Sequence, residues 1–326
     1  MSLTNQPTAK PAWHKLKAWF VGLLLLSGLI LMVTHFGEVK HFVELLRQAK
    51  PAWLILALLL QAMTYASVAA VWYLALKQEE MHHSFLSLVP LGIAKLFSDQ
   101  VMPSGGMSGT TFFIAALNHR GVPVHLCMAT LLLSLVVYYG AYLLAALVSV
   151  LVLWFYHAIH VWIMVVVGIF CFVAVGIPAG ALWVRSLGKK ELPALLLRIP
   201  GLNNVMSAFA NAPGNLLRSP SLVISATLLH TAVFVLDAGT LWVMLQMVGV
   251  PVSFWVAFPS FVLASIAATV SPIPLGLGSF EVTCVSMLGL LGIPIEAALT
   301  STVLLRGFTL WLPMLPGMWF AKRALR

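Results

Sequence analysis

Long runs of apolar residues are the feature that most restricts what this chain can fold into. A helix needs roughly 20 such residues to cross the hydrocarbon core of a bilayer. Only 8% of the 326 residues are charged and 61% are hydrophobic, whereas about a quarter of an ordinary soluble domain is charged. The sequence therefore predicts an all-α polytopic membrane protein forming one membrane domain, 1–326. Six runs are long enough to cross: 18–36, 51–76, 123–156, 159–184, 221–248 and 294–321.

Two further apolar regions, 84–119 and 254–292, are interrupted by proline and glycine. The first contains VMPSGGMSG and the second contains PIPLGLGSFEV. When the two regions are aligned on their prolines, identical residues recur at the same offsets. The aligned pairs are Pro103 with Pro274, Gly105 with Gly276, Ser108 with Ser279, Gly121 with Gly292, and Pro123 with Pro294.

Each interrupted region predicts a re-entrant helical hairpin. A serine that can cap a new helix follows each break, and the second arms, 109–119 and 280–291, are too short to cross about 30 Å of hydrocarbon. We expect about six full spans and two hairpins, one in a first repeat, 51–156, and one in an inverted second repeat, 221–321. Transporters with a mid-membrane site have this organisation. The competing interpretation is that both breaks are ordinary kinks between packed helices.

The basic residues indicate orientation rather than nucleic-acid binding, although the formal net charge is +9. With a cytoplasmic N-terminus, Lys and Arg gather inside in the tail 1–17, in the segment 185–220 and at the C-terminus. Only Lys40, Arg47 and Lys50 fall outside. The positive-inside rule then places both termini in the cytoplasm. We expect the protein in the cytoplasmic (inner) membrane. The segment 185–220 is either an amphipathic helix on anionic lipid or a solvated connector.

Few charged residues lie inside the apolar stretches, and each is costly there unless it is paired or hydrated. Glu281 falls in the first turn after the second break, where a helix N-terminus favours negative charge. It forms with the mid-span Arg306 either a structural ion pair or part of a substrate site. Lys95 and Asp99, at i and i+4, offer the same two alternatives on the first arm.

His230 and Asp237 are seven residues apart and share a helix face. Their alternatives are interhelical hydrogen bonding and a proton relay. The three cysteines, Cys127, Cys171 and Cys284, fall in apolar stretches without metal-ligand or paired spacing, which is typical of packing residues.

The C-terminal motifs PIPLGLGSFEV, LLGIP and STVLLRGF resemble the flippase-like transmembrane family that includes the membrane half of lysylphosphatidylglycerol synthases. Glu281 and Arg306 occupy the matching places. The stretch LFSDQVMPSGGMSG resembles that family more loosely, because Thr110, Thr111 and Phe112 replace the charged residues expected after the glycines. The resemblance implies movement of a polar-headed lipid between leaflets: an aminoacylated phospholipid, a glycolipid or a polyprenyl-phosphate carrier. It does not imply aminoacyl transfer.

We therefore expect a transporter whose partners are membrane lipids with an anionic or zwitterionic headgroup. We expect no nucleic acid, no cofactor, no metal and no catalytic residue. The alternatives are an intramembrane transferase that uses Glu281 as its base and a membrane scaffold; HExxH, Gly-x-Ser-x-Gly and paired-aspartate patterns are absent from the sequence. The predicted substrate-binding residues are Arg306, Glu281, Ser279, Gly276, Gly278, Ser108, Gly105, Gly106, Asp99 and Lys95, with Asp237 and His230 as the predicted relay.

Overall fold

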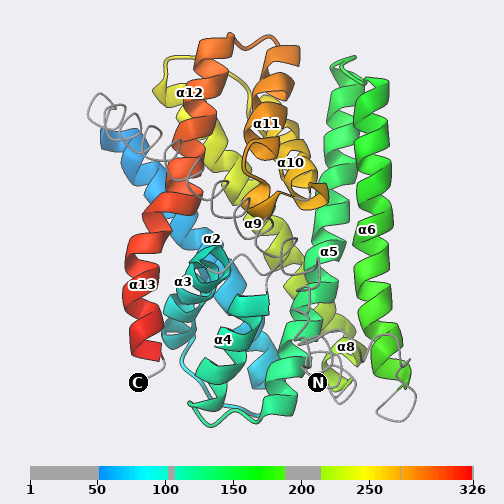
Figure 1. Cartoon of the computed structure of the whole chain (residues 1–326), viewed down its shortest axis with the longest axis vertical. Coiled ribbons are helices and arrows are strands. Elements are labelled where there is room, and N and C mark those ends of the chain that lie inside the picture. Colours follow the sequence, from blue (N-terminus) through cyan, green and yellow to red (C-terminus); the bar gives the residue numbers. More distant parts are fainter. Residues whose placement is uncertain (1–50, 102–106, 188–213, 272, 325–326) are drawn as a thin grey trace, which may run out of the picture. The chain divides into compact units, whose positions relative to one another are not determined.

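The structure, a computed structural model, describes residues 51–101, 107–187, 214–271 and 273–324. All of these residues belong to one compact unit, residues 49–326. Every regular element in this part of the chain is helical (Figure 1), so the all-α expectation is confirmed there. Several predicted features lie outside the described residues: the tail 1–17, the span 18–36, the glycines Gly105 and Gly106, and most of the segment 185–220.

Five helical segments are long and apolar enough to cross a membrane, and they match five of the six predicted spans to within a few residues. Proline lies at or just before the start of several of these helices. It is tolerated there because the backbone N–H at the first helical position makes no hydrogen bond within the helix. Pro220 opens its helix, whereas Pro123 and Pro294 directly precede theirs. The segments are α2 (Pro51–Gln78), α5 (Val124–Phe155), α6 (Val161–Leu187), α9 (Pro220–Met247), and α12 (Ile295–Arg306) continued by the π-helical turn η3 (Gly307–Trp311) and α13 (Leu312–Ala324).

Each interrupted region contains two short helices that pack against each other. The longer arm of each has 17 residues, or about 26 Å at 1.5 Å per residue. Figure 1 shows the two pairs in opposite halves of the unit. The pairs are α3 (Phe85–Val101) with α4 (Met107–Asn118), and α10 (Phe254–Val270) with α11 (Ser279–Leu290), joined by the 3-10 turn η2 (Pro274–Gly276).

Helices from the N-terminal half of the chain pack directly against helices from its C-terminal half. The most extensive helix contact is between α2 and α9, and the next is between α3 and α13. The helix α10 also packs against α5, α6 and α9, and the short helix α8 (Asn215–Arg218) packs against α5 and α9. Each hairpin is therefore held by helices from both halves.

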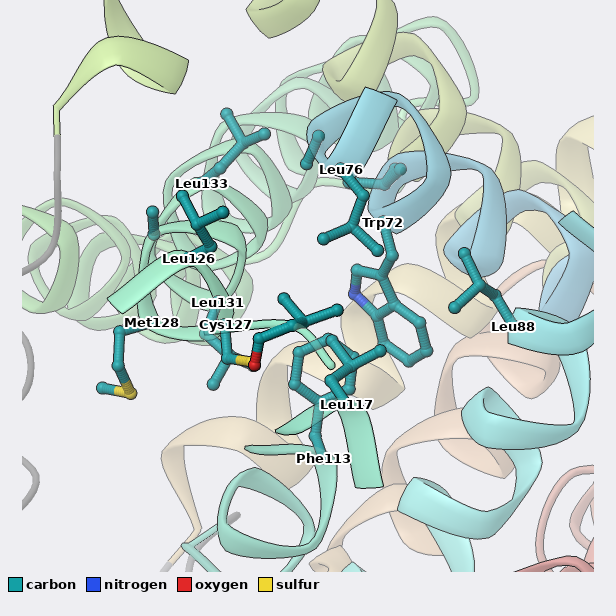
Figure 2. Close-up of a cluster of buried hydrophobic side chains, with 14 of the residues drawn as sticks. Trp72, Leu76, Leu88, Phe113, Leu117, Leu126, Cys127, Met128, Leu131 and Leu133 are labelled. Carbon is teal, nitrogen blue, oxygen red and sulfur yellow. The ribbon is translucent and has the colours of Figure 1, made fainter. Parts of the chain in front are cut away.

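A cluster of buried apolar side chains holds α2, α3, α4 and α5 together (Figure 2). Trp72 of α2 lies against Phe113 of α4 with ring centroids 4.5 Å apart, and Leu88 and Leu117 are fully buried beside them. Burying an aromatic pair of this kind stabilises the packing of the first hairpin on the spanning helices. By contrast, α6 presents large apolar side chains outward, among them Phe172 at 82% exposure, as a lipid-facing helix would.

Candidate functional site

The backbone between α10 and α11 runs through conformations that glycine tolerates best. Gly276 and Gly278 have φ angles of 62° and 82°, and Leu275 adopts a φ of 60°. A side chain at Gly276 would collide with Ala268 of α10, which explains why the break needs glycine there. In this conformation the carbonyl oxygen of Leu275 accepts a hydrogen bond of 3.1 Å from Arg306 Nη2. Strained backbone of this kind clusters at functional sites.

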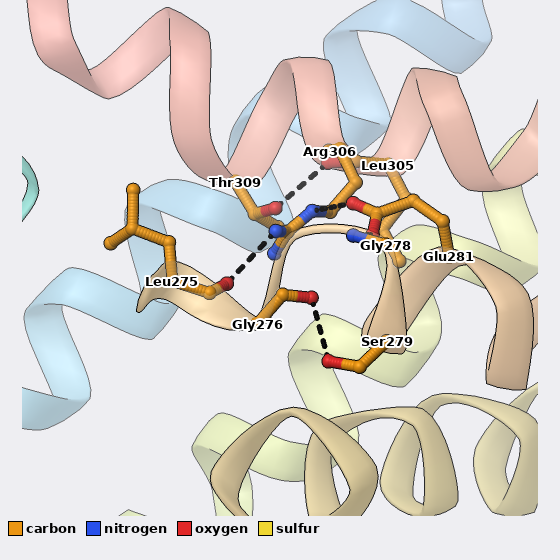
Figure 3. Close-up of polar contacts among 8 residues, drawn as sticks. All are labelled: Leu275, Gly276, Gly278, Ser279, Glu281, Leu305, Arg306 and Thr309. Carbon is orange, nitrogen blue, oxygen red and sulfur yellow. Dashed lines mark hydrogen bonds and ion pairs between the residues drawn. The ribbon is translucent and has the colours of Figure 1, made fainter. Parts of the chain in front are cut away.

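Glu281 joins the start of α11 to the last spanning helix (Figure 3). Its Oε2 accepts a 2.6 Å hydrogen bond from the backbone N–H of Gly278, the residue that caps α11. Its Oε1 accepts a 2.6 Å bond from Arg306 Nε. The carboxylate therefore satisfies one free N–H of the helix N-terminus and one buried cation together.

Arg306 is the last residue of α12 and is only 8% exposed. Its guanidinium lies over the ring of Phe280, 4.8 Å from the centroid, so cation–π attraction adds to the two hydrogen bonds. The π-helical turn η3 begins at the next residue. Figure 3 shows Thr309 in that turn donating its hydroxyl to the carbonyl of Leu305. A π turn widens a helix locally and is frequent at functional sites.

The expectation that a serine caps the second arm is wrong for both hairpins. Ser279 is the first residue of α11, and its hydroxyl donates to the carbonyl of Gly276 at 3.0 Å. Ser108 donates to the carbonyl of Ser98 at 2.9 Å. The Ser279 hydroxyl thus bonds to the break, and the Ser108 hydroxyl bonds to α3. At each helix start a carboxylate binds one backbone N–H instead.

In the first hairpin that carboxylate is Asp99, which reaches across from α3 to α4. Its Oδ1 accepts a 2.8 Å bond from the N–H of Gly109, and its Oδ2 pairs with Lys95 Nζ at 2.8 Å. The predicted i, i+4 pair is therefore confirmed. A side chain at Gly109 would collide with the Asp99 carboxylate. The two hairpins share one arrangement: a carboxylate binds the start of the second arm and also pairs with a basic side chain.

Gln100, next to Asp99, is a buried polar residue that was not among the predicted site residues. Its side chain is 8% exposed, yet neither its amide nitrogen nor its amide oxygen has a hydrogen-bond partner in the described part of the chain. Leaving such a group unsatisfied costs about 1–3 kcal/mol, and buried polar groups in native proteins are nearly always bonded. The signal in the sequence was a glutamine at the end of the apolar arm LGIAKLFSDQV.

Asp237 forms the interhelical hydrogen bonds that the sequence analysis gave as one alternative. Its Oδ1 accepts bonds from Gln61 Nε2 at 3.0 Å and from Thr64 Oγ1 at 3.2 Å, both on α2. His230 lies instead against its own helix, with Nδ1 3.3 Å from the carbonyl of Ala226, and its ring contacts Tyr138 of α5. In the described helices no contact joins His230 directly to Asp237.

The described residues bring together no group of three or more His, Cys, Asp or Glu side chains that could hold a metal ion. The chemistry that the two breaks offer is recognition of a polar group: fixed cations, amide groups and serine hydroxyls at the ends of short helices. A comparison with protein-family models matches residues 19–317 to the family described as the lysylphosphatidylglycerol synthase TM region. The chain matches no curated protein.

Proposed function

The chain belongs to the lysylphosphatidylglycerol synthase TM region family, and from this premise we propose that it moves a polar-headed lipid between the leaflets of the cytoplasmic membrane. The proposed cargo is a phospholipid or glycolipid with an anionic or zwitterionic headgroup. We propose transport without chemical change to the lipid, and we assign no catalytic residue.

The proposed arrangement in the membrane has six full spans, the sixth supplied by 18–36, and two re-entrant hairpins. The pairs α3/α4 and α10/α11 enter from opposite sides, which makes the two repeats inverted, and both termini are cytoplasmic. The opposite placement of the two pairs in Figure 1 and the shortness of their helices support this arrangement. Broken backbone at membrane depth lies where it lines a cavity or is buried in protein.

In the second hairpin we propose that Arg306 binds the anionic part of the headgroup. Its guanidinium is planar, stays charged and can form paired hydrogen bonds to phosphate or carboxylate oxygens. In the structure its Nε and Nη2 point at acceptors, Glu281 and the carbonyl of Leu275. Glu281 then holds the guanidinium when no lipid is bound and yields part of it to the arriving headgroup.

In the first hairpin we propose a second subsite for the polar part of the headgroup. Asp99 and Lys95 supply opposite charges one helical turn apart, as a zwitterionic group would need. The buried amide of Gln100 supplies a donor and an acceptor that the described residues leave unbonded. A headgroup passing through would satisfy that amide.

The observation that carries the proposal is the buried Arg306–Glu281 pair at a helix break in a chain of this family. The test is reconstitution of the purified protein into liposomes that contain a headgroup-labelled phospholipid. Transport predicts faster movement of the label between leaflets than in protein-free vesicles, with the lipid recovered unchanged by mass spectrometry. A chemically modified lipid would indicate a transferase, and neither movement nor modification would indicate a scaffold.

A further inference from the structure

A carboxylate with only neutral partners lies midway along the two central spanning helices. Asp237 and its partners Gln61 and Thr64 are all near the middle of 28-residue helices, α9 and α2. Within the described residues Asp237 forms no ion pair, and both of its hydrogen bonds come from uncharged groups. A charged carboxylate without a cation is costly at such a position, so a proton is the simplest partner for it.

The hydroxyl of Thr64 can form a hydrogen bond with Asp237 whether Asp237 is charged or protonated. It lies 3.2 Å from the carbonyl of Leu60 and 3.2 Å from Asp237 Oδ1, and its single hydrogen can serve only one of them at a time. When Asp237 is charged, Thr64 donates to it. When Asp237 is protonated, the acid can donate to Thr64 Oγ1, while Thr64 donates to Leu60.

Gln61 links the same carboxylate to the contact between α2 and α9. Its Nε2 donates to Asp237 Oδ1 and also, at 3.0 Å, to Thr240 Oγ1. The charged carboxylate therefore draws two donors of α2 onto α9. A neutral Asp237 attracts them less, so protonation changes the relative free energy of arrangements that differ in how α2 and α9 pack.

The surroundings of Asp237 hold few other titratable groups. Tyr65 of α2 and Tyr138 of α5 lie near enough to interact electrostatically with Asp237. Tyr138 also contacts the ring of His230. The helix α10 carries no charged residue. The remaining helices packed on α9 carry Arg218, Glu296 and Arg306, and none of these bonds to Asp237 within the described chain.

We propose that Asp237 binds and releases one proton in each transport cycle, so that a proton gradient sets the rate of lipid movement. The proton comes from water on one side, forms the O–H bond of the Asp237 acid, and returns to water on the other side. This inference rests on the transport function proposed above, and it adds the coupled ion to it.

Proton binding itself is measured without any transport. We would follow the carbonyl stretch of protonated carboxylic acids by infrared spectroscopy on the full chain in lipid while the pH is varied. The chain has nine Asp and Glu side chains, and among their titrating bands we expect one that Asp237→Asn removes and Glu296→Gln keeps. Thr64→Val removes a partner of both forms, but the bond to the charged carboxylate is the stronger of the two, so the variant should raise the midpoint by up to about one pH unit. Thr227→Val, which removes a hydroxyl bonded only to the backbone of its own helix, should leave the midpoint unchanged.

Coupling is measured as flux of labelled lipid in liposomes under an imposed pH gradient or an imposed sodium gradient. We expect the rate of lipid movement by the wild type to change severalfold with the pH gradient alone. The rate of the Asp237→Asn variant should not depend on the pH gradient. Wild-type flux that ignores the pH gradient, or follows sodium instead, would overturn the inference, as would the absence of any band assignable to Asp237 or of a Thr64→Val shift. A wild-type protein that moves no lipid would overturn the proposed function instead, and the infrared titration would still decide whether Asp237 binds the proton.

Discussion

Arg306 Nε and Glu281 Oε1 lie 2.6 Å apart although the two residues are 25 positions apart and on different helices. The contact connects the start of α11 to the end of α12, at the point where the π turn begins. Because both side chains are largely buried, the contact is protected from solvent screening, and removing one partner leaves the other without compensation. The pair can be structural, functional or both, and these roles separate when stability and flux are measured on the same variants.

Glu281→Gln leaves Arg306 as a buried cation beside a neutral amide. We expect it to lower the free energy of unfolding by roughly 1–3 kcal/mol. The double variant Glu281→Gln/Arg306→Met removes the cation as well, so it should be more stable than Glu281→Gln alone. Thermal unfolding in detergent measures both. Stability losses that simply add, with no recovery in the double variant, would show that the two side chains are not energetically coupled.

The glycines of the second hairpin should differ in their tolerance of a methyl group. Gly276→Ala meets both a positive φ and a collision with Ala268, whereas Gly278→Ala meets only the positive φ, with open space around it. Gly289→Ala, in the exposed last turn of α11, should be neutral or stabilising by up to about 1 kcal/mol. We expect stability and flux to fall most in Gly276→Ala, less in Gly278→Ala and not in Gly289→Ala. Equal behaviour of the three variants would show that the break is an ordinary kink.

Gln100→Leu tests whether the buried amide of Gln100 binds the headgroup or has no role in transport. Removing an unbonded amide should leave the free energy of unfolding unchanged or raise it by about 1–3 kcal/mol. If Gln100 binds the headgroup, flux per folded molecule should nevertheless fall severalfold. The matched variant is Gln246→Leu, whose amide already donates to the carbonyl of Val252; it should lose some stability and keep its flux. Unchanged flux in Gln100→Leu would remove this residue from the site.

The hydrophobic pattern predicted the spanning helices well because length and apolarity alone decide whether a helix suits a bilayer. It also located both breaks, since proline and glycine act on the backbone locally. The Lys95–Asp99 pair was predictable for the same reason, because one turn of helix brings the two side chains together. The spans were off by at most a few residues where fraying and capping set the ends.

The partners of the buried polar groups could not be predicted in the same way. Asp99 binds the N–H of Gly109 across a break, and Asp237 binds Gln61 of a helix more than 170 residues away. These contacts depend on how helices from the two halves are aligned, which no local pattern encodes. The serine caps were predicted wrongly because Ser, Gly and Glu near one helix start all suit capping, and the left-handed backbone at Gly278 decided between them.

The inverted topology predicts which side of the membrane each hairpin faces. In a variant without Cys127, Cys171 and Cys284, single cysteines at Glu80 and His119, at the ends of the first hairpin, should react with a membrane-impermeant thiol reagent only from the cytoplasm. Cysteines at Pro251 and Glu296, at the ends of the second hairpin, should react only from outside, according to the distribution of basic residues. All four positions are exposed. Labelling of all four from one side would contradict the inverted repeat.

The central claim is that Arg306 recognises the lipid headgroup through the shape of its guanidinium as well as through its charge. The most direct test is the flux of labelled lipid in liposomes that contain equal amounts of folded wild-type, Arg306→Lys or Arg323→Lys protein. Lysine keeps the charge but cannot reproduce two fixed N–H directions, so Arg306→Lys should lose roughly tenfold or more in flux. Arg323→Lys, at the exposed end of α13, should match the wild type. Wild-type flux in folded Arg306→Lys protein would contradict the claim and leave the Arg306–Glu281 pair a structural contact.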